Sequence, residues 1–223
     1  MSLPTEFSTF AVPVRGGPLA GGVWHRDARG LPLLAVHGIT ANHRSWSLVA
    51  DALPGTRVIA PDLRGRGRSN TLPGPFGLID HADDLARLLD GLEVDRAVVA
   101  GHSMGGFVGV RFAERHPDRV ASLVLVDGGL PLPPPPGIPP EEAAAAALGP
   151  AIERLGMCFA SRDDYAQFWR RHPGLGPYWN EAVADYVDYD LTGEEPELHP
   201  SAASEAVAAN VLELDGSAGM PRP

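Results

Sequence analysis

Short apolar runs alternate with amphipathic segments along the first 130 residues. Four runs have the length and the apolar, β-branched composition of buried strands: residues 31–36, 57–60, 96–100 and 120–126. An amphipathic helix is predicted by apolar residues at steps of four and three: Leu78, Ala82, Leu85, Leu89 and Leu92. Strands that alternate with helices predict an α/β fold with a mostly parallel central sheet. The run 120–126 is apolar on both faces, so we expect it to lie inside that sheet.

Two further elements complete the predicted core. A leading hairpin is predicted at residues 7–15 and 19–25, around a Gly-Gly-Pro turn. A short helix is predicted by the spacing of Trp46, Val49 and Leu53, and a Pro-Gly pair follows it.

The character of the chain changes after residue 130. Residues 131–140 are rich in proline, which removes backbone donors and fixes φ, so we interpret them as a hinge. Beyond Val126 only helices are predicted, at residues 141–148, 165–171, 178–189 and 201–214. An aromatic stripe favours packing against the core over a substrate wall: Tyr165, Phe168, Trp169 and His172.

The segment Val-Val-Ala-Gly-His-Ser-Met-Gly-Gly, residues 98–106, carries the candidate chemistry. An apolar run ends at Gly101-His102-Ser103, and Met104-Gly105 opens a helix-compatible segment. A serine at so tight a strand-to-helix turn has a strained backbone, which small flanking residues such as Gly101 and Gly105 accommodate. The turn exposes the hydroxyl, and the N–H groups at the start of the helix face any developing negative charge. Ser103 is therefore the candidate nucleophile.

Two more candidate motifs lie upstream of the serine motif. The run 31–36 leads into His37-Gly38, and residues 61–69 read Pro-Asp-Leu-Arg-Gly-Arg-Gly-Arg-Ser. With the serine motif, they resemble the alpha/beta-hydrolase superfamily, whose members carry such loops after the third, fourth and fifth strands. The resemblance implies an oxyanion hole formed by the backbone N–H groups of Ile39 and Met104. It assigns supporting motif roles to His37, Gly38, Gly101, His102 and Gly105.

The same resemblance implies an acid and a histidine on later strands, in the order Ser, acid, His. We therefore expect an incomplete alpha/beta-hydrolase fold: residues 1–130 form the core, and residues 131–223 form the Pro-rich hinge and a helical lid, with the C-terminal core strands missing. Asp127 is the best acid candidate, although an ordinary Asp-Gly turn explains it as well. For the base, His81 is assigned to the solvent side of its helix, and His172 and His199 are the free alternatives.

The predicted function is serine hydrolysis of an acyl, ester-like substrate of hydrophobic character, impaired in this chain because the usual acid and histidine are lacking. The alternative is a catalytically incompetent fragment or pseudoenzyme that acts by binding. If no strand pairs with residues 120–126, they form an exposed edge suited to self-association.

Composition narrows the class of partner. The net charge of −10 excludes a nucleic-acid partner, because phosphate binding needs a basic surface. We accordingly expect Arg64, Arg66 and Arg68 to form a solvated loop. The lone cysteine, Cys158, forms no internal disulfide and fits a reducing compartment. No metal cluster, cofactor motif, secretion signal or membrane-spanning run is evident, so a cytoplasmic location without a membrane partner is expected.

Overall fold

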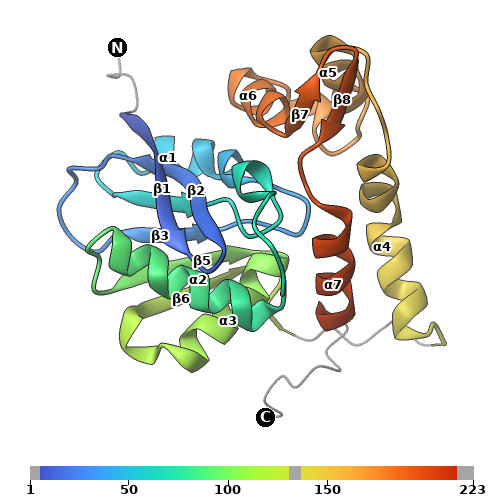
Figure 1. The fold of residues 1–223 in the computed structure, drawn as a ribbon. Helices are drawn as coiled ribbons and strands as arrows, with labels where there is room; N and C mark the ends of the chain where they lie inside the picture. The colour runs from blue at the N-terminus through green and yellow to red at the C-terminus, as the bar shows by residue number, and fades with distance from the viewer. Residues whose placement is uncertain (1–5, 131–136, 215–223) are drawn as a thin grey trace.

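Six strands form one central sheet (Figure 1). The structure, a computed structural model, describes residues 6–130 and 137–214. The strands are β1 (Phe7–Val14), β2 (Gly17–Trp24), β3 (Leu33–Val36), β4 (Val58–Pro61), β5 (Ala97–His102) and β6 (Val120–Val126). Their order in the sheet is β1-β2-β4-β3-β5-β6. β2 pairs antiparallel with β1 and β4, and the other neighbours are parallel. The prediction of an α/β fold with a mostly parallel central sheet is confirmed.

Helices connect these strands and cover both faces of the sheet. They are η1 (His43–Trp46), α1 (Ser47–Asp51), η2 (Gly67–Ser69), α2 (Leu78–Gly91), α3 (Met104–Arg115) and η3 (Pro117–Arg119). Crossover helices of this kind allow neighbouring strands to run parallel.

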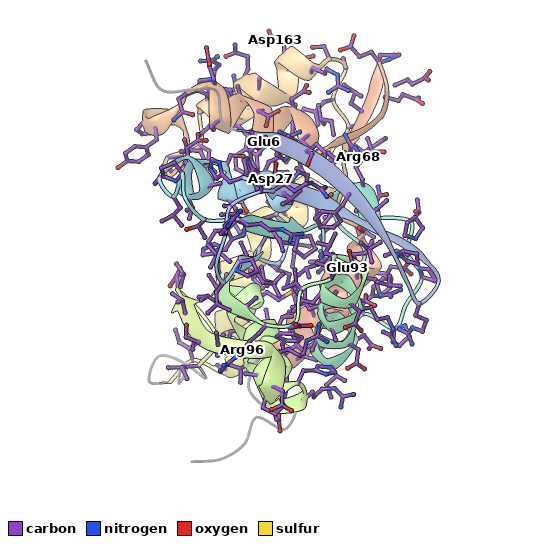
Figure 2. All side chains as sticks on the ribbon, turned by 90° about the vertical axis from the view of Figure 1, so that its left-hand side faces the viewer. Glu6, Asp27, Arg68, Glu93, Arg96 and Asp163 are labelled. Carbon is purple, nitrogen blue, oxygen red and sulfur yellow. The ribbon has the colours of Figure 1, made fainter. Side chains whose placement is uncertain are left out.

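A second group of elements, here called the helical segment, spans residues 137–214. It contains α4 (Pro140–Leu155), α5 (Arg162–Arg170), η4 (Gly176–Tyr178), α6 (Glu181–Tyr189), β7 (Leu191–Glu194), β8 (Glu197–Pro200) and α7 (Ser204–Leu214). In Figure 1, α4 and α7 lie side by side next to the core, and α5, α6 and the β7–β8 hairpin form the upper end. Figure 2 gives a second view, with Asp163 of α5 at the upper end of the molecule, Arg96 in its lower part and Arg68 between them.

The helical segment differs from the sequence prediction in two respects. It contains the antiparallel β7–β8 hairpin, although only helices were expected after residue 126. The two strands are four residues each and bury little more than Leu191 and Leu198, so they carry no detectable apolar alternation. In addition, Tyr165 packs with these two leucines and Val187 in a cluster internal to the helical segment, so the aromatic stripe does not mainly serve packing against the core.

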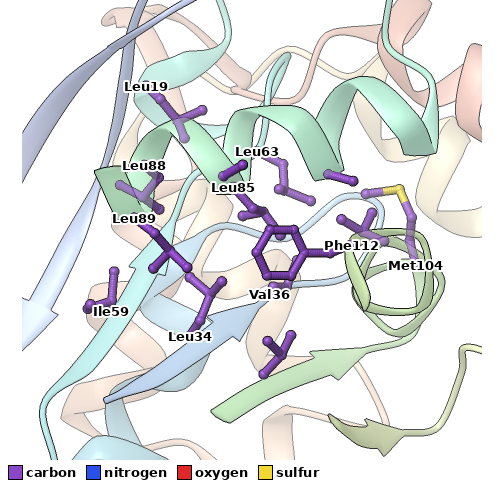
Figure 3. Close-up of a cluster of buried hydrophobic side chains, with 14 of the residues drawn as sticks. Leu19, Leu34, Val36, Ile59, Leu63, Leu85, Leu88, Leu89, Met104 and Phe112 are labelled. Carbon is purple, nitrogen blue, oxygen red and sulfur yellow. The ribbon is translucent and has the colours of Figure 1, made fainter. Parts of the chain in front are cut away.

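The main hydrophobic core lies between the sheet and helices α2 and α3. Leu34 and Ile59 of the sheet meet Leu85 of α2 and Phe112 of α3 there, as Figure 3 shows. The stripe predicted for residues 78–92 is therefore the buried face of α2.

The opposite face of the sheet is covered by Trp46 and Ala50. The spacing of Trp46, Val49 and Leu53 predicted this helix, but Val49 and Leu53 are 38% and 37% exposed, whereas Trp46 is buried. The 3₁₀ turn η1 precedes α1 and changes the angular step per residue, so a regular helical spacing across both gives the wrong face.

Strand β6 lies at the edge of the sheet, whereas its apolar sequence favoured an interior position. Its Val124 and Val126 point to one face and are 46% and 41% exposed. Within the described residues, β6 therefore matches the alternative expectation of an exposed apolar edge strand.

The two sides of α2 predict different responses to truncation. Leu85→Ala removes a fully buried side chain and should lower the free energy of unfolding by about 2–5 kcal/mol. Ile79→Ala on the same helix removes a side chain that is 47% exposed and should change it by less than about 1 kcal/mol. Urea denaturation followed by circular dichroism measures both, and equal losses would contradict the assigned buried face.

Candidate active site

Ser103 joins β5 to α3 in a backbone conformation that side chains rarely adopt, with φ +51° and ψ −121°. Its N–H donates to the carbonyl of Val126 at 2.9 Å, and its own carbonyl accepts from the N–H of Gly106 at 2.9 Å. A conformation of this kind costs on the order of 1–3 kcal/mol and persists only where the surroundings enforce it. The bend leaves Ser103 partly exposed at the carboxyl end of the parallel strands.

Glycines allow the backbone to pack closely around this bend. A Cβ on Gly101 would lie 2.1 Å from the carbonyl oxygen of Gly105, and a Cβ on Gly105 would lie 2.1 Å from that of Val36. A Cβ on Gly128 would lie 2.3 Å from the carbonyl oxygen of Ser103. Only glycine fits these positions, so the ends of β3, β5 and β6 meet in backbone contact around residue 103.

The loop after β3 lies against the same bend. A Cβ on Gly38 would lie 3.4 Å from Cβ of Ser103 and 3.3 Å from Nδ1 of His102. Ile39 and Met104 are both buried. Within the described residues, neither of their backbone N–H groups has a protein acceptor. Two amide donors without a protein acceptor therefore lie near the bend, one directly after Ser103 and one on the adjacent loop. They are the amides for which the family resemblance implies an oxyanion-binding role.

His37 is fully buried and fastens two loops together. Its Nε2 accepts from the N–H of Leu63 at 3.0 Å, so Nδ1 carries the proton and donates to the carbonyl of Gly38 at 2.7 Å. Burial lowers the pKa of His37 to about 4, and it is neutral at physiological pH. Both ring nitrogens are engaged, so His37 positions the loop and is not available as a base.

Asp62 organises the loop between β4 and α2. One oxygen, Oδ1, accepts from the backbone N–H and the ring Nδ1 of His43, both at 2.9 Å, and Oδ2 accepts from the N–H of Arg68 at 2.9 Å. Burial disfavours the charged form, but these hydrogen bonds to His43 and Arg68 lower the pKa of Asp62 below its usual value. A buried carboxylate thus holds the loops after β3 and β4 in fixed relation.

The expectation of a solvated arginine loop is wrong for two of the three arginines. Arg64 and Arg66 are 0% exposed, and only Arg68 reaches the surface. Arg64 forms a paired contact with Asp84 of α2, with Nε and Nη2 donating at 2.9 Å. The assignment of His81 to solvent is also wrong, because it is fully buried against α7. Asp84 and Asn210, the partners of Arg64 and His81, lie on other elements of the fold, so the spacing of residues within one segment could not reveal them.

The helical segment contacts the core through the loop after β4, which carries Asp62 and Arg68. The hydroxyl of Tyr189 in α6 donates to Oδ2 of Asp62 at 2.7 Å. The guanidinium of Arg68 lies 4.3 Å from the centre of the Tyr189 ring and donates to the carbonyl of Leu191 at 3.2 Å. The loop after β4 therefore joins the helical segment to the candidate site.

A largely apolar cleft of about 290 Å³ lies between the core and the helical segment. His102, the residue before Ser103, lines it together with residues of the loop after β3 and of the helical segment: Ala41, Arg44, Ser45, Leu48, Leu175, Ala182, Val183 and Tyr186. The cleft is thus adjacent to the strained bend.

The structure does not bring the candidate acid or bases to Ser103. No described side chain forms a hydrogen bond with the Ser103 hydroxyl. Asp127 is exposed in a turn with φ +48°, beside the Ser103 backbone but without a histidine partner among the described residues. His172 accepts from the N–H of Gly174, and His199 contacts the carbonyl of Met157, both inside the helical segment.

In residues 6–130 and 137–214, no group of three or more His, Cys, Asp and Glu side chains is arranged to hold a metal ion. None of the helices in these ranges combines the length and apolar character needed for a bilayer span.

Comparison with known proteins identifies the family. A family model described as alpha/beta hydrolase fold matches residues 32–155, more than half of the chain. The chain belongs to the alpha/beta hydrolase fold family. The matched region contains the loops after β3 and β4 and the bend at Ser103.

Two relatives of this member of the alpha/beta hydrolase fold family have hydrolase names. Lipase LipV of Mycobacterium tuberculosis is 41% identical over 100 residues, which are 45% of this chain and 38% of the lipase. A serine hydrolase-like protein of Danio rerio is 35% identical over 123 residues, which are 54% of this chain and 37% of that protein. The chain thus matches less than two-fifths of the length of these relatives.

Solved structures extend the likeness to the helical segment. The crystal structure of E-2-(acetamidomethylene)succinate hydrolase matches with a TM-score of 0.75 and 26% identity, over 94% of this chain and 74% of that one. A thioesterase domain from the curacin biosynthetic pathway matches with a TM-score of 0.70 at 19% identity, a likeness of fold alone.

Close backbone contact at the bend predicts a sharp difference between two glycines of α3. Gly105→Ala forces a Cβ against the carbonyl of Val36 and should lower the free energy of unfolding by about 1–3 kcal/mol or more. Gly109→Ala is the control, because the nearest atom to its Cβ is a side-chain methyl of Leu123 at 3.0 Å, and alanine favours a helix. Chemical denaturation compares them, and a greater loss for Gly109→Ala would contradict the packing described.

Two buried histidines predict acid sensitivity. Burial lowers the pKa of His37 to about 4 and that of His81 to about 3, whereas both bind a proton near pH 6.5 in the unfolded chain. Their contribution to stability is therefore complete above pH 6.5 and is lost as the pH falls toward 4, by at most about 1.4 kcal/mol per pH unit for each. His81→Gln should remove the contribution of one histidine to this pH dependence of the free energy of unfolding. Unfolding titrations between pH 4 and 7 measure it, and the same reduction in the exposed-site control His199→Gln would contradict the assignment.

Proposed function

We propose that this alpha/beta hydrolase is a serine hydrolase that acts on acyl, ester-like substrates. Ser103 Oγ attacks the acyl carbon, the carbonyl π electrons move to oxygen, and the N–H groups of Ile39 and Met104 bind the resulting oxyanion. The leaving group departs with a proton as the acyl–Ser103 ester forms. Water then attacks that ester and releases the acid and free Ser103.

One observation carries this proposal: the strained bend at Ser103, next to two buried amides that have no protein acceptor. Backbone strain is retained where it serves a purpose, and amide donors in a water-poor site stabilise an anion strongly. Removal of one such donor typically costs about 10²–10³ in rate. Family membership supports the same reaction class.

The apolar cleft supports a hydrophobic acyl group. Its walls beside His102 are mainly aliphatic, including Leu48 of the core and Leu175 and Val183 of the helical segment. Apolar pockets with few polar groups are typical of small hydrophobic ligands. In this proposal residues 6–130 belong to the catalytic core, and residues 137–214 form the lid that covers the substrate. Most of the Pro-rich segment predicted as a hinge, residues 131–136, lies outside the described residues.

Impaired catalysis is part of the proposal. The Ser103 hydroxyl has no base among the described residues, and Asp127 has no histidine to orient. In the well-studied serine proteases, loss of a triad member leaves about 10³–10⁴-fold catalysis over water, which comes from the oxyanion hole and binding. The 223-residue polypeptide should therefore react slowly but at the correct atom.

A fluorophosphonate probe tests the nucleophile. We expect slow, single-site modification of Ser103, detected by peptide mass spectrometry over hours, and its complete loss in Ser103→Ala. Ser122→Ala is the control, since Ser122 is exposed on the neighbouring strand β6 and should label like the parent chain. Absence of label at Ser103 would refute the nucleophile, and stoichiometric labelling within minutes would refute the impairment.

The second candidate function is binding without catalysis, and the exposed edge favours it. Unpaired strand edges with apolar faces are templates for association, and β6 presents Val124 and Val126. We expect the chain to self-associate with increasing concentration in size-exclusion chromatography with light scattering. The double exchange of Val124 and Val126 to Lys should restore the monomer of 23.6 kDa.

The matched control exchanges two exposed apolar residues away from the edge, Ile79 and Leu212, to Lys. Association that disappears equally in both double variants, or a parent chain that remains monomeric at every concentration, would contradict a role for the β6 edge.

A further inference from the structure

Arg66 is a buried cation without an anionic partner. Its side chain is 0% exposed, and in residues 6–130 and 137–214 it forms no ion pair with a carboxylate. Its neighbour Arg64, equally buried, is by contrast paired with Asp84. Burial lowers the pKa of Arg66 to about 9, so the guanidinium remains charged at neutral pH. A buried charge balanced only by dipoles is costly, so its retention calls for an explanation.

The contacts of Arg66 converge on the two residues proposed to bind the oxyanion. Its Nε donates to the carbonyl of Ile39 at 2.9 Å, and its Nη2 lies 3.9 Å from Sδ of Met104. The remaining donors bind the carbonyl of Arg64 at 2.9 Å and that of Ala206 in α7 at 3.3 Å. The planar guanidinium thus contacts the carbonyl of Ile39, the side chain of Met104 and the backbone of α7, and it does not line the apolar cleft.

The charge of Arg66 also acts on the loop that carries Ile39. It is one of the charges that lower the pKa of His37, two residues before Ile39. The same positive potential that disfavours a second cation favours an anion nearby, because Coulomb interactions are weakly screened in a buried site.

We propose that Arg66 is a positioning residue for the oxyanion hole, which holds the Ile39 loop against Met104 and adds a fixed positive charge behind the two amides. This inference rests on the proposed function, because it requires an anion to form at Ser103. Arg66 does not touch the substrate and acts only through Ile39, Met104 and its field. The arrangement supplies the preorganisation that an oxyanion hole requires, since the donors need no movement when charge develops.

The test uses the full chain and the phosphonyl adduct of Ser103, whose P–O oxygen takes the place of the oxyanion. Arg66→Met removes the charge at similar volume, and Arg66→Lys keeps the charge but loses the planar set of donors. We expect the maximal modification rate to fall by about 10–100-fold in Arg66→Met and by a smaller factor in Arg66→Lys. The probe concentration for half-maximal rate should stay within about twofold, because Arg66 does not line the cleft.

A spectroscopic measurement separates positioning from a merely structural role. In ¹⁵N–¹H spectra of the parent adduct, formed by long incubation, the amide protons of Ile39 and Met104 should move downfield relative to the free protein. In both Arg66 variants the downfield shift of Ile39 should be reduced. The control replaces the buried pair Arg64 and Asp84 by Gln and Asn, which removes a buried guanidinium without touching either amide, and it should retain the parent rate and shifts.

The outcomes distinguish this inference from the proposed function. An unmodified Ser103 in the parent chain refutes the proposed function and, with it, the role of Arg66. An Arg66 variant can instead keep the parent modification rate and the parent Ile39 shift and differ only by a lower unfolding temperature. That result refutes the positioning role but not the proposed function, and it leaves Arg66 as an anchor for α7. If Arg66→Met does not fold, Arg66→Lys decides by the same two readouts.

Discussion

The strained backbone of Ser103 is the constraint on which the rest of the site depends. A residue with φ +51° between a buried strand and a helix is maintained only by dense packing, and here glycines let the ends of β3, β5 and β6 approach in backbone contact. The same close approach sets Gly38 and Ile39 beside the bend. Strain, glycine packing and the unpaired amides are therefore one feature, and loss of any part would disturb the others.

Buried polar groups hold the surrounding loops. Asp62 joins the loop after β3 through His43, the loop after β4 through Arg68, and the helical segment through Tyr189. Arg66 connects the Ile39 loop to α7 in a similar way. Such networks tie distant segments to one geometry because each buried group must keep its hydrogen bonds. The helical segment is thus joined to the site by specific polar contacts as well as by apolar packing.

The candidate site has two unpaired amide donors beside Ser103, but the Ser103 hydroxyl has no hydrogen-bond partner among the described residues. Bend, amides and apolar cleft are in place, whereas no described histidine reaches Ser103. Serine hydrolysis needs two separable contributions. Amide donors stabilise the oxyanion, and a base that accepts the hydroxyl proton makes the serine nucleophilic. The chain matches only part of the length of its relatives, and in the proposed function its described residues provide the oxyanion-binding contribution.

Features that depend on local chemistry could be predicted from the amino-acid sequence. Apolar periodicity identified the strands and the buried face of α2, and the glycine-flanked serine identified the bend, because these signals arise from neighbouring residues. Features that depend on partners far apart in the chain could be recognised only in the folded protein. Arg64, Arg66 and His81 looked solvent-facing by spacing, yet Asp84, Ile39 and Asn210 from other elements bury them. Polar side chains carry no periodic signal of burial, since the cost of desolvation is offset by partners that only the folded chain brings together.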